Sequence, residues 1–243
     1  MADSPTPSST LSSAGVISPT SSATRPLTIC YVCTSNVCRS PMAAAIASSI
    51  LASGLLSSSL PPIRVISRGL TDNYSKWGSS ASNRMVTAAG ARLAKSPLAQ
   101  THISNFLSLH KSTPMTREEA SDPNTIIFLV TSKHISWLSS AVTPEITNSA
   151  TSQNRLKQID SPDPSTNHDI ADPYFGDQND YDLVCSHLLY SVPLSLMRVL
   201  VERGCVGEDE RKAVEEDVKG KGDWGGEMLE VAREFGRMQG QAG

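Results

Sequence analysis

The sequence LTICYVCTSNVCRSPM, residues 27–42, combines a strand, a turn and the start of a helix in one short segment. Its first six residues form an apolar run of strand length, and Ser40-Pro41 opens an alanine-rich run that predicts a helix. A loop that leaves a strand and enters a helix directs backbone N–H groups inward, and the helix dipole adds partial positive charge there. Residues 33–40, which we name the anion loop, are therefore predicted to bind a phosphate-like oxyanion.

Two reactive or charged side chains flank this loop. Cys33 stands at its start and Arg39 near its end. A thiol is nucleophilic as its thiolate, which the loop N–H groups and the Arg39 guanidinium should favour at neutral pH. Arg39 at a helix N-terminus opposes the dipole, so a bound anion explains its position better than solvation does. The anion loop would thus both bind the anion and activate the nucleophile.

A zinc site is the alternative for the cysteines of this loop. Cys33 and Cys38 could be two of its ligands, or they could be buried core thiols. Cys30 and Cys33 have CxxC spacing, but Cys30 lies in the predicted strand, where it is most simply a small buried hydrophobe, and no histidine-rich stretch accompanies these cysteines. The five histidines, His134 among them, are scattered without a ligand-like spacing, so we expect them at the surface or in packing positions. The pattern favours a nucleophile and predicts no metal or other cofactor.

The segment VCTSNVCRSP, residues 32–41, resembles the phosphate-binding loop of the low-molecular-weight protein tyrosine phosphatases, a family that shares its fold with one class of arsenate reductases. The family pattern is Cys, five residues, Arg and then Ser, and this chain matches it from Cys33 to Ser40. The resemblance implies that the Cys33 thiolate attacks phosphorus, that Arg39 holds phosphoryl oxygens and that Ser40 assists the departing thiolate. The residues implied to bind phosphate are Thr34, Ser35, Asn36, Val37, Cys38, Arg39 and Ser40.

A phosphatase also needs a general acid, because a protonated oxygen leaves a phosphate ester far more easily. Three Asp-Pro pairs compete for this role, at Asp122, Asp163 and Asp172. Only the third is followed by aromatic residues and glycine, and it stands shortly before the last long helix. It resembles the acid-bearing Asp-Pro-Tyr-Tyr/Phe-Gly element of the family, which implies that Asp172 is the acid. The other two pairs fit simple turns better.

Aromatic residues are expected to form the wall of a substrate slot. Tyr174 and Phe175 follow the acid, and the resemblance implies that a ring here stacks on the substrate, which favours phosphotyrosine over phosphoserine. Tyr74 and Trp77 fall where the family keeps an aromatic wall beside its site, although packing on their own loop explains them equally well. The expected partners are phosphotyrosine-containing proteins or small aryl phosphates.

Two departures from the family pattern keep other functions open. Ser35 replaces a loop glycine that often has a positive φ, and Ser82 replaces an aspartate that braces the loop. Both changes fit a non-catalytic module that binds phosphate or a partner. An arsenate reductase is a further alternative, but it needs an additional redox cysteine. The candidates, Cys185 and Cys205, lie in or at the end of the last long helix and are poorly placed for that role.

Cys38 also predicts redox control. Cys33 and Cys38 flank one tight loop, so their sulfur atoms could approach within disulfide range. A sulfenic acid formed at Cys33 would then be captured by Cys38 as a reversible disulfide, which protects Cys33 from irreversible oxidation. The alternative is that Cys38 packs beneath the loop as a small apolar residue.

The rest of the chain alternates predicted strands and helices. The strands are expected at residues 27–32, 63–66, 125–130 and 156–159. Right-handed crossovers between them predict a single α/β domain, with a four-stranded parallel sheet, helices on both faces and the anion loop after the first strand. The segments 95–124 and 140–155 lack a regular pattern and are expected to be loops. Pro193 should kink or break the last long helix, residues 180–203.

Composition divides the chain into three parts. We expect a disordered Ser- and Thr-rich tail in residues 1–25, a phosphatase-like domain in 26–204 and a charged extension in 205–243. Insertions around 95–124 and 140–170 are expected to lengthen the domain. A net charge of -3 over 243 residues gives no indication of nucleic-acid binding. The five cysteines, without a signal peptide or an apolar run long enough to span a bilayer, predict a cytoplasmic protein with no membrane partner.

Overall fold

The computed structural model describes residues 25–52, 56, 60–72, 84–85, 87–88, 97–160 and 169–220. Several positions singled out above lie outside these described residues. They are residues 1–24 of the predicted tail, Tyr74, Trp77, Ser82, Asp163 and residues 221–243.

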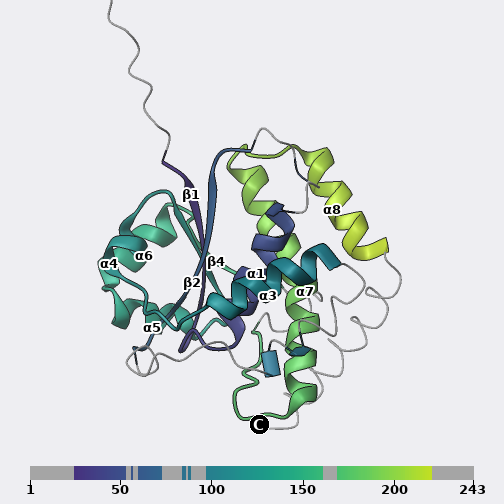
Figure 1. Ribbon diagram of the computed structural model, residues 1–243. Helices are drawn as coiled ribbons and strands as arrows, with labels where there is room; N and C mark the ends of the chain where they lie inside the picture. Colours follow the sequence, from purple (N-terminus) through teal and green to yellow (C-terminus); the bar gives the residue numbers. More distant parts are fainter. Residues whose placement is uncertain are drawn as a thin grey trace, which may run out of the picture.

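The sheet contains four parallel strands in the order β2-β1-β3-β4 (Figure 1). The strands are β1 (Leu27–Cys33), β2 (Ile63–Gly69), β3 (Thr125–Leu129) and β4 (Leu156–Gln158). β1 lies inside the sheet, and its last residue, Cys33, is opposite Gly69 at the end of β2. The predicted α/β class and its parallel four-stranded sheet are confirmed, and the start of the anion loop lies at the carboxyl edge.

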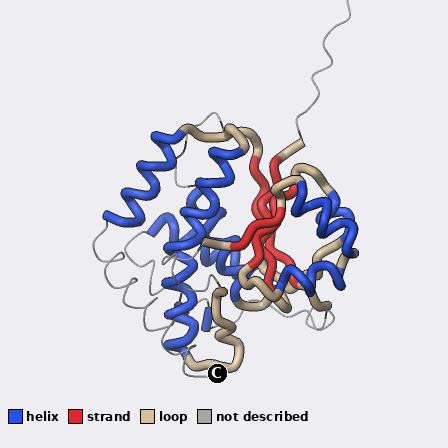
Figure 2. Tube along the Cα trace, turned by 180° about the vertical axis from the view of Figure 1, so that it is seen from behind, coloured by secondary structure: helices blue, strands red, loops and turns tan. Residues whose placement is uncertain are grey.

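Helices cover both faces of the sheet, which runs between two groups of helices in Figure 2. One group is α1 (Arg39–Ala52), α3 (Pro97–Leu109), α7 (Gln178–Glu202) and α8 (Glu208–Gly220), and the other is α4 (Arg117–Ser121), α5 (His134–Ala141) and α6 (Pro144–Ser152). Successive side chains of a strand point to opposite faces. Tyr31 of β1 therefore belongs to the core under the first group, and Val32 to the core under the second.

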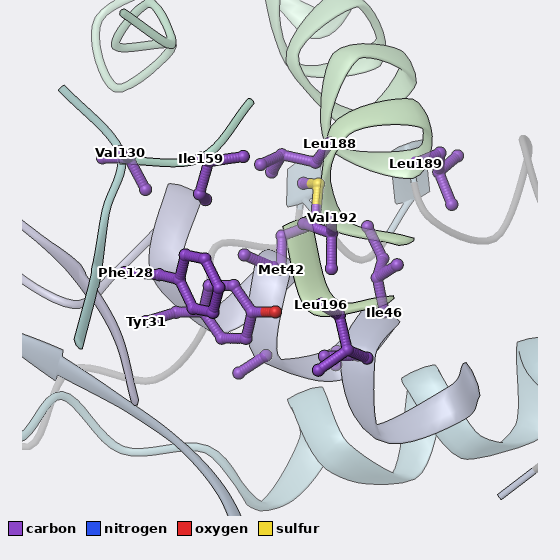
Figure 3. Packing of buried hydrophobic residues seen from close by; sticks show 14 of the residues in the cluster. Tyr31, Met42, Ile46, Phe128, Val130, Ile159, Leu188, Leu189, Val192 and Leu196 are labelled. Atoms are coloured by element: carbon purple, nitrogen blue, oxygen red, sulfur yellow. The ribbon is translucent and has the colours of Figure 1, made fainter. Parts of the chain in front are cut away.

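The larger core lies between the sheet and the helices α1 and α7 (Figure 3). Tyr31 stacks on Phe128, its neighbour in β3, with ring centroids 5.2 Å apart. Met42 of α1 and Leu188 and Val192 of α7 belong to the same buried cluster. Because this cluster includes the first turn of α1, it holds the anion loop between two packed elements.

Three helices occupy the segments that were expected to be loops, so that expectation was wrong. α3 buries Ile103 and Leu107, four residues apart on one helical face, in the core that it shares with α1. α4 begins with a capping box between Thr116 and Glu119, and α6 follows an N-cap threonine, Thr143, with proline at its first position. Caps stabilise the short helices α4 and α6, and the buried face of α3 holds it against α1.

α7 continues through Pro193, so the expected break does not occur in this helix. Pro193 is buried, and packing on both sides compensates for the hydrogen bond that proline cannot make. The helix ends in a Schellman motif, in which Gly204 has a φ of 64° and the Cys205 N–H donates to Leu200 O at 2.8 Å. The glycine at this position is therefore required by the left-handed backbone.

The length and composition of α7 would allow it to cross a membrane, so the expectation that no apolar run is long enough was wrong. However, 78% of its most apolar window is buried inside the protein. A helix in the centre of a globular core meets the same criteria of length and composition. The apolar residues of α7 are explained by its contacts with α1 and α8, in the buried cluster that also contains residues of the sheet.

Candidate active site

The anion loop reverses direction at Asn36. Asn36 has a φ of 55°, in the left-handed region, which asparagine tolerates better than most residues. Among the described residues, Ser35 is not one of those with a positive φ. The serine at this position therefore carries no left-handed strain, and it gives no reason to exclude a catalytic loop.

The Cys33 thiol, at the end of β1, receives a hydrogen bond from the loop. Ser40 Oγ donates to Cys33 Sγ at 3.1 Å, and Asn36 Nδ2 donates to the same hydroxyl oxygen at 2.9 Å. The Thr113 N–H donates to Asn36 Oδ1 at 3.0 Å and fixes the orientation of this amide. A donor directed at sulfur stabilises the thiolate, which fits the predicted nucleophile.

The outer side of the loop is held through its carbonyl groups. His110 Nε2 donates to Asn36 O at 2.7 Å, and Ser112 Oγ donates to Ser35 O at 2.6 Å. Two N–H groups that follow β2 donate to Thr34 O. Burial lowers the pKa of His110, while the bond to Asn36 O acts in the opposite direction. These contacts fix the path of the backbone from outside.

The inner side of the loop carries unpaired donors. The N–H groups of residues 34–38 donate to no group in the described part of the chain. Gly69 lies directly behind, where a Cβ would come within 3.0 Å of the Ser35 carbonyl carbon and 3.2 Å of the Asn36 nitrogen. Glycine thus permits the close approach of β2 to the loop. A run of unpaired N–H groups before a helix N-terminus is an arrangement that binds phosphate.

Arg39 and Asp172 form an ion pair at this loop. Arg39 Nη2 donates to Asp172 Oδ2 at 2.6 Å, and Arg39 Nη1 donates to Ile170 O at 3.0 Å. The Arg39 side chain is 6% exposed and that of Asp172 is 49% exposed, so a buried cation meets a carboxylate that reaches solvent. Arg39 Nε is buried and has no hydrogen-bond partner among the described residues. This N–H is thus free, among the described residues, to donate to an oxyanion.

A comparison with known protein families supports the same chemistry. The family described as low molecular weight phosphotyrosine protein phosphatase matches residues 28–200, a range that includes every residue of the site described above. The chain belongs to this family. A comparison with curated proteins finds no match.

Solved structures of phosphatases share the fold. A protein tyrosine phosphatase from Entamoeba histolytica has a TM-score of 0.54 and 17% identity, over 73% of this chain and 98% of its own. A low molecular weight phosphotyrosine phosphatase from Vibrio cholerae O395 has a TM-score of 0.53 and 18% identity, over 73% and 99%. The YwlE arginine phosphatase from Geobacillus stearothermophilus has a TM-score of 0.52 and 24% identity, over 72% and 97%. These similarities establish the fold, and family membership together with the fold supports a phosphatase that acts on phosphoproteins or small phosphate esters.

The predicted acid, Asp172, and two aromatic residues share one turn. The Tyr174 N–H donates to Asp172 Oδ1 at 3.3 Å. The rings of Tyr174 and Phe175 meet edge to face with centroids 4.9 Å apart, and Phe175 is 96% exposed. An exposed aromatic pair therefore lies next to the predicted acid. Asp122, by contrast, precedes β3 at the opposite edge of the sheet, where its side chain accepts a hydrogen bond within a turn.

His134, which no sequence pattern singled out, lies against the anion loop. Its Nε2 is 3.1 Å from Thr34 Oγ1, and its Nδ1 is 3.0 Å from Thr131 Oγ1. His134 was expected at the surface or in a packing position, whereas its ring contacts a residue of the predicted phosphate site. His110 and Ser112 were missed as well, because they follow a segment without a regular pattern and only the fold brings them to the loop.

Cys38 points away from solvent, toward α7. Its Sγ lies 3.3 Å from the hydroxyl oxygen of Tyr181, and burial raises the pKa of this thiol to about 12. A protonated, buried thiol beside a hydroxyl is compatible with a packing role. The predicted capture of oxidised Cys33 by Cys38 stays a prediction.

Proposed function

We propose that the protein is a protein tyrosine phosphatase of the low-molecular-weight class, which hydrolyses phosphotyrosine and other aryl phosphate monoesters through a phosphocysteine. One observation carries the proposal: a thiol with a hydroxyl donor, a run of N–H groups without a partner in the described part of the chain and an arginine paired with an aspartate all meet at one loop. In this arrangement Cys33 is the nucleophile, Arg39 and the loop hold the phosphoryl group, and Asp172 is the acid.

In the first step, the Cys33 thiolate attacks phosphorus. The S–P bond forms while the bond from phosphorus to the phenol oxygen breaks, and Asp172 gives its proton to that leaving oxygen. Arg39 and the loop N–H groups hold the other phosphoryl oxygens, so their donors stabilise the negative charge of the transition state. Asp172 must therefore leave its place on Arg39 Nη2 when it serves the leaving group.

In the second step, water attacks the phosphorus of phosphocysteine. Asp172, now a carboxylate, takes a proton from this water while the new P–O bond forms and the S–P bond breaks. The hydroxyl of Ser40 stabilises the departing Cys33 thiolate through the same hydrogen bond that it makes in the free protein. Inorganic phosphate is released and the thiolate is regenerated.

The exposed rings of Tyr174 and Phe175 support an aryl phosphate as substrate, since an aromatic leaving group could stack on them. A phosphotyrosine side chain in a protein presents such a group. The chemistry also requires Cys33 as a reduced thiol, which supports the proposed location in the cytosol. Phosphoarginine is the relevant competing substrate, because an arginine phosphatase is among the structural relatives.

The test is a comparison of kcat/KM for matched peptides with phosphotyrosine, phosphoserine or phosphoarginine, in buffer with EDTA and with vanadate as inhibitor. We expect the highest kcat/KM for phosphotyrosine and complete loss of turnover in Cys33→Ser. A higher value for phosphoarginine would contradict the tyrosine specificity but not the phosphatase. A protein that binds phosphate and turns over none of the peptides would instead be the non-catalytic module considered above.

A further inference from the structure

His134 opens α5, immediately after the loop that follows β3, and the residue is only 2% exposed. Both ring nitrogens have hydroxyl neighbours. Nδ1 is 3.0 Å from Thr131 Oγ1, and Nε2 is 3.1 Å from Thr34 Oγ1 in the anion loop. The ring thus connects the end of β3 to the residue that follows the predicted nucleophile.

The hydroxyl of Thr34 also touches Arg39. Arg39 Nη2 lies 3.3 Å from Thr34 Oγ1, and an arginine can only donate. The Thr34 oxygen therefore accepts from Arg39, and its single proton is available for His134 Nε2. This assignment makes Nε2 the acceptor and leaves the ring proton on Nδ1, where it is donated to Thr131 Oγ1.

The neutral form of His134 fits this direction of the hydrogen bonds. Burial, followed by the nearby charge of Arg39, lowers the pKa of His134 to about 4. At neutral pH the ring therefore keeps one nitrogen as an acceptor. A charged ring would have two donors and could not accept the Thr34 proton.

Neighbouring contacts fix the position of the ring. Trp137, one helical turn further along α5, meets the ring edge to face with centroids 5.5 Å apart. The loop before α5 is held by Asp169, whose carboxylate accepts from the N–H and, at 3.1 Å, from the hydroxyl of Ser132. His134 is therefore anchored independently of its contact with Thr34.

We propose that His134 is a positioning residue for the phosphatase reaction, which acts through the hydroxyl of Thr34 to hold the guanidinium of Arg39 in place. The inference rests on the proposed function. Its importance follows from the catalytic cycle: when Asp172 moves to the leaving oxygen, Arg39 Nη2 keeps Thr34 as its remaining partner among the described residues. An oriented guanidinium loses less freedom when it binds the phosphoryl oxygens.

Two substitutions of similar size separate this role from simple packing. The amide of His134→Gln can reach the position of Nε2 and accept from Thr34, whereas the shorter amide of His134→Asn reaches only the position of Nδ1. We expect His134→Asn to lower kcat/KM for p-nitrophenyl phosphate about tenfold and to weaken the binding of inorganic phosphate about fivefold, the scale of one lost hydrogen bond. His134→Gln should stay within about twofold of the wild type for both quantities.

The role of Thr34 is tested by a double-mutant cycle. Thr34→Val keeps the shape of the side chain and removes the hydroxyl, so we expect it to reproduce the losses of His134→Asn. In the Thr34→Val background, His134→Asn should cause little further loss, because the connection is already broken. His102→Asn, on α3, is the matched control and should leave both quantities unchanged, and thermal melting monitors the folding of each variant.

The proposal is overturned if His134→Asn and His134→Gln lose activity and phosphate affinity equally, or if the effects of Thr34→Val and His134→Asn add fully. Titration with inorganic phosphate needs no turnover, so it tests the role of His134 separately from the proposed function. A wild-type protein that binds phosphate but hydrolyses no phosphate ester contradicts the proposed function alone, and the titrations then decide this inference. A wild-type protein that binds no phosphate contradicts both.

Discussion

Replacement of Asp172 by Asn should slow turnover and, at the same time, tighten the binding of phosphate. The first effect follows from the loss of the general acid, which typically contributes about 10²- to 10⁴-fold to the rate. The second follows from the ion pair. In the free protein the Asp172 carboxylate occupies Arg39 Nη2, so an incoming phosphate must displace it. An amide at the same position carries no charge and competes weakly.

The size of the second effect can be worked out from the geometry. Arg39 Nη2 and Asp172 Oδ2 are 2.6 Å apart, and the Asp172 side chain is 49% exposed. At this separation two unit charges in bulk water attract each other by about 1.6 kcal/mol. Measured pairs with exposed side chains contribute about 0.2–1 kcal/mol, because solvent screens them and the side chains lose entropy. We take about 1 kcal/mol, which corresponds to an affinity about fivefold higher.

Isothermal titration with inorganic phosphate measures the affinity, and p-nitrophenyl phosphate hydrolysis measures kcat. Asp122→Asn is the control, because Asp122 also precedes a proline but lies in a turn at the opposite edge of the sheet. This control should resemble the wild type in both assays. Unchanged or weaker phosphate binding by Asp172→Asn would refute the competition, and a larger loss of kcat in Asp122→Asn would refute the choice of acid.

Three further substitutions test other parts of the structure. Cys33→Ser should abolish hydrolysis of p-nitrophenyl phosphate but keep the fold and phosphate binding, since serine preserves the shape without a thiolate, and residual turnover would contradict the mechanism. Tyr31→Phe removes a buried hydroxyl that has no partner among the described residues, so the free energy of unfolding, measured with urea, should rise by about 1 kcal/mol. A lower free energy of unfolding would contradict this expectation. After brief peroxide treatment, dithiothreitol should restore activity fully in the wild type and poorly in Cys38→Ser, whereas equal recovery would leave Cys38 only its packing contact with Tyr181.

The local sequence pattern was sufficient to predict the anion loop and the strands. An apolar run, a loop and Ser40-Pro41 follow one another within residues 27–42, so no distant part of the chain is needed to recognise a strand, a turn and a helix start. The apolar run that forms β3 is likewise a local signal, because a strand covered on both faces must be apolar throughout. The conformation at Asn36 also suits its residue type, since asparagine tolerates the left-handed backbone found there.

The helices α3, α4 and α6 show where local pattern misleads. The segments that contain them are rich in Ser, Thr and Pro and lack a regular apolar pattern, which predicted loops, although α4 itself consists mainly of strong helix formers. The capping signals at Thr116 and Thr143 are present in the sequence and could have indicated two of the starts. Burial of Ile103 and Leu107 of α3 could not be predicted, because it depends on the arrival of α1 at the same place.

By itself, the sequence determined which residues are predicted to carry the chemistry, since Cys33 and Arg39 belong to one short motif and Asp172 to another. Only the tertiary structure decided what surrounds them. The hydrogen bond between Thr34 and His134 joins residues 100 positions apart, and that between Asn36 and His110 joins residues 74 positions apart. For His134 the physical reason is the strand order: β3 lies beside β1 in the sheet, so the segments that follow these two strands meet at the carboxyl edge, whatever their separation along the chain. For His110 it is the backbone pairing of residues 113 and 115 with Gly69 at the end of β2, which brings the segment after α3 to the same loop.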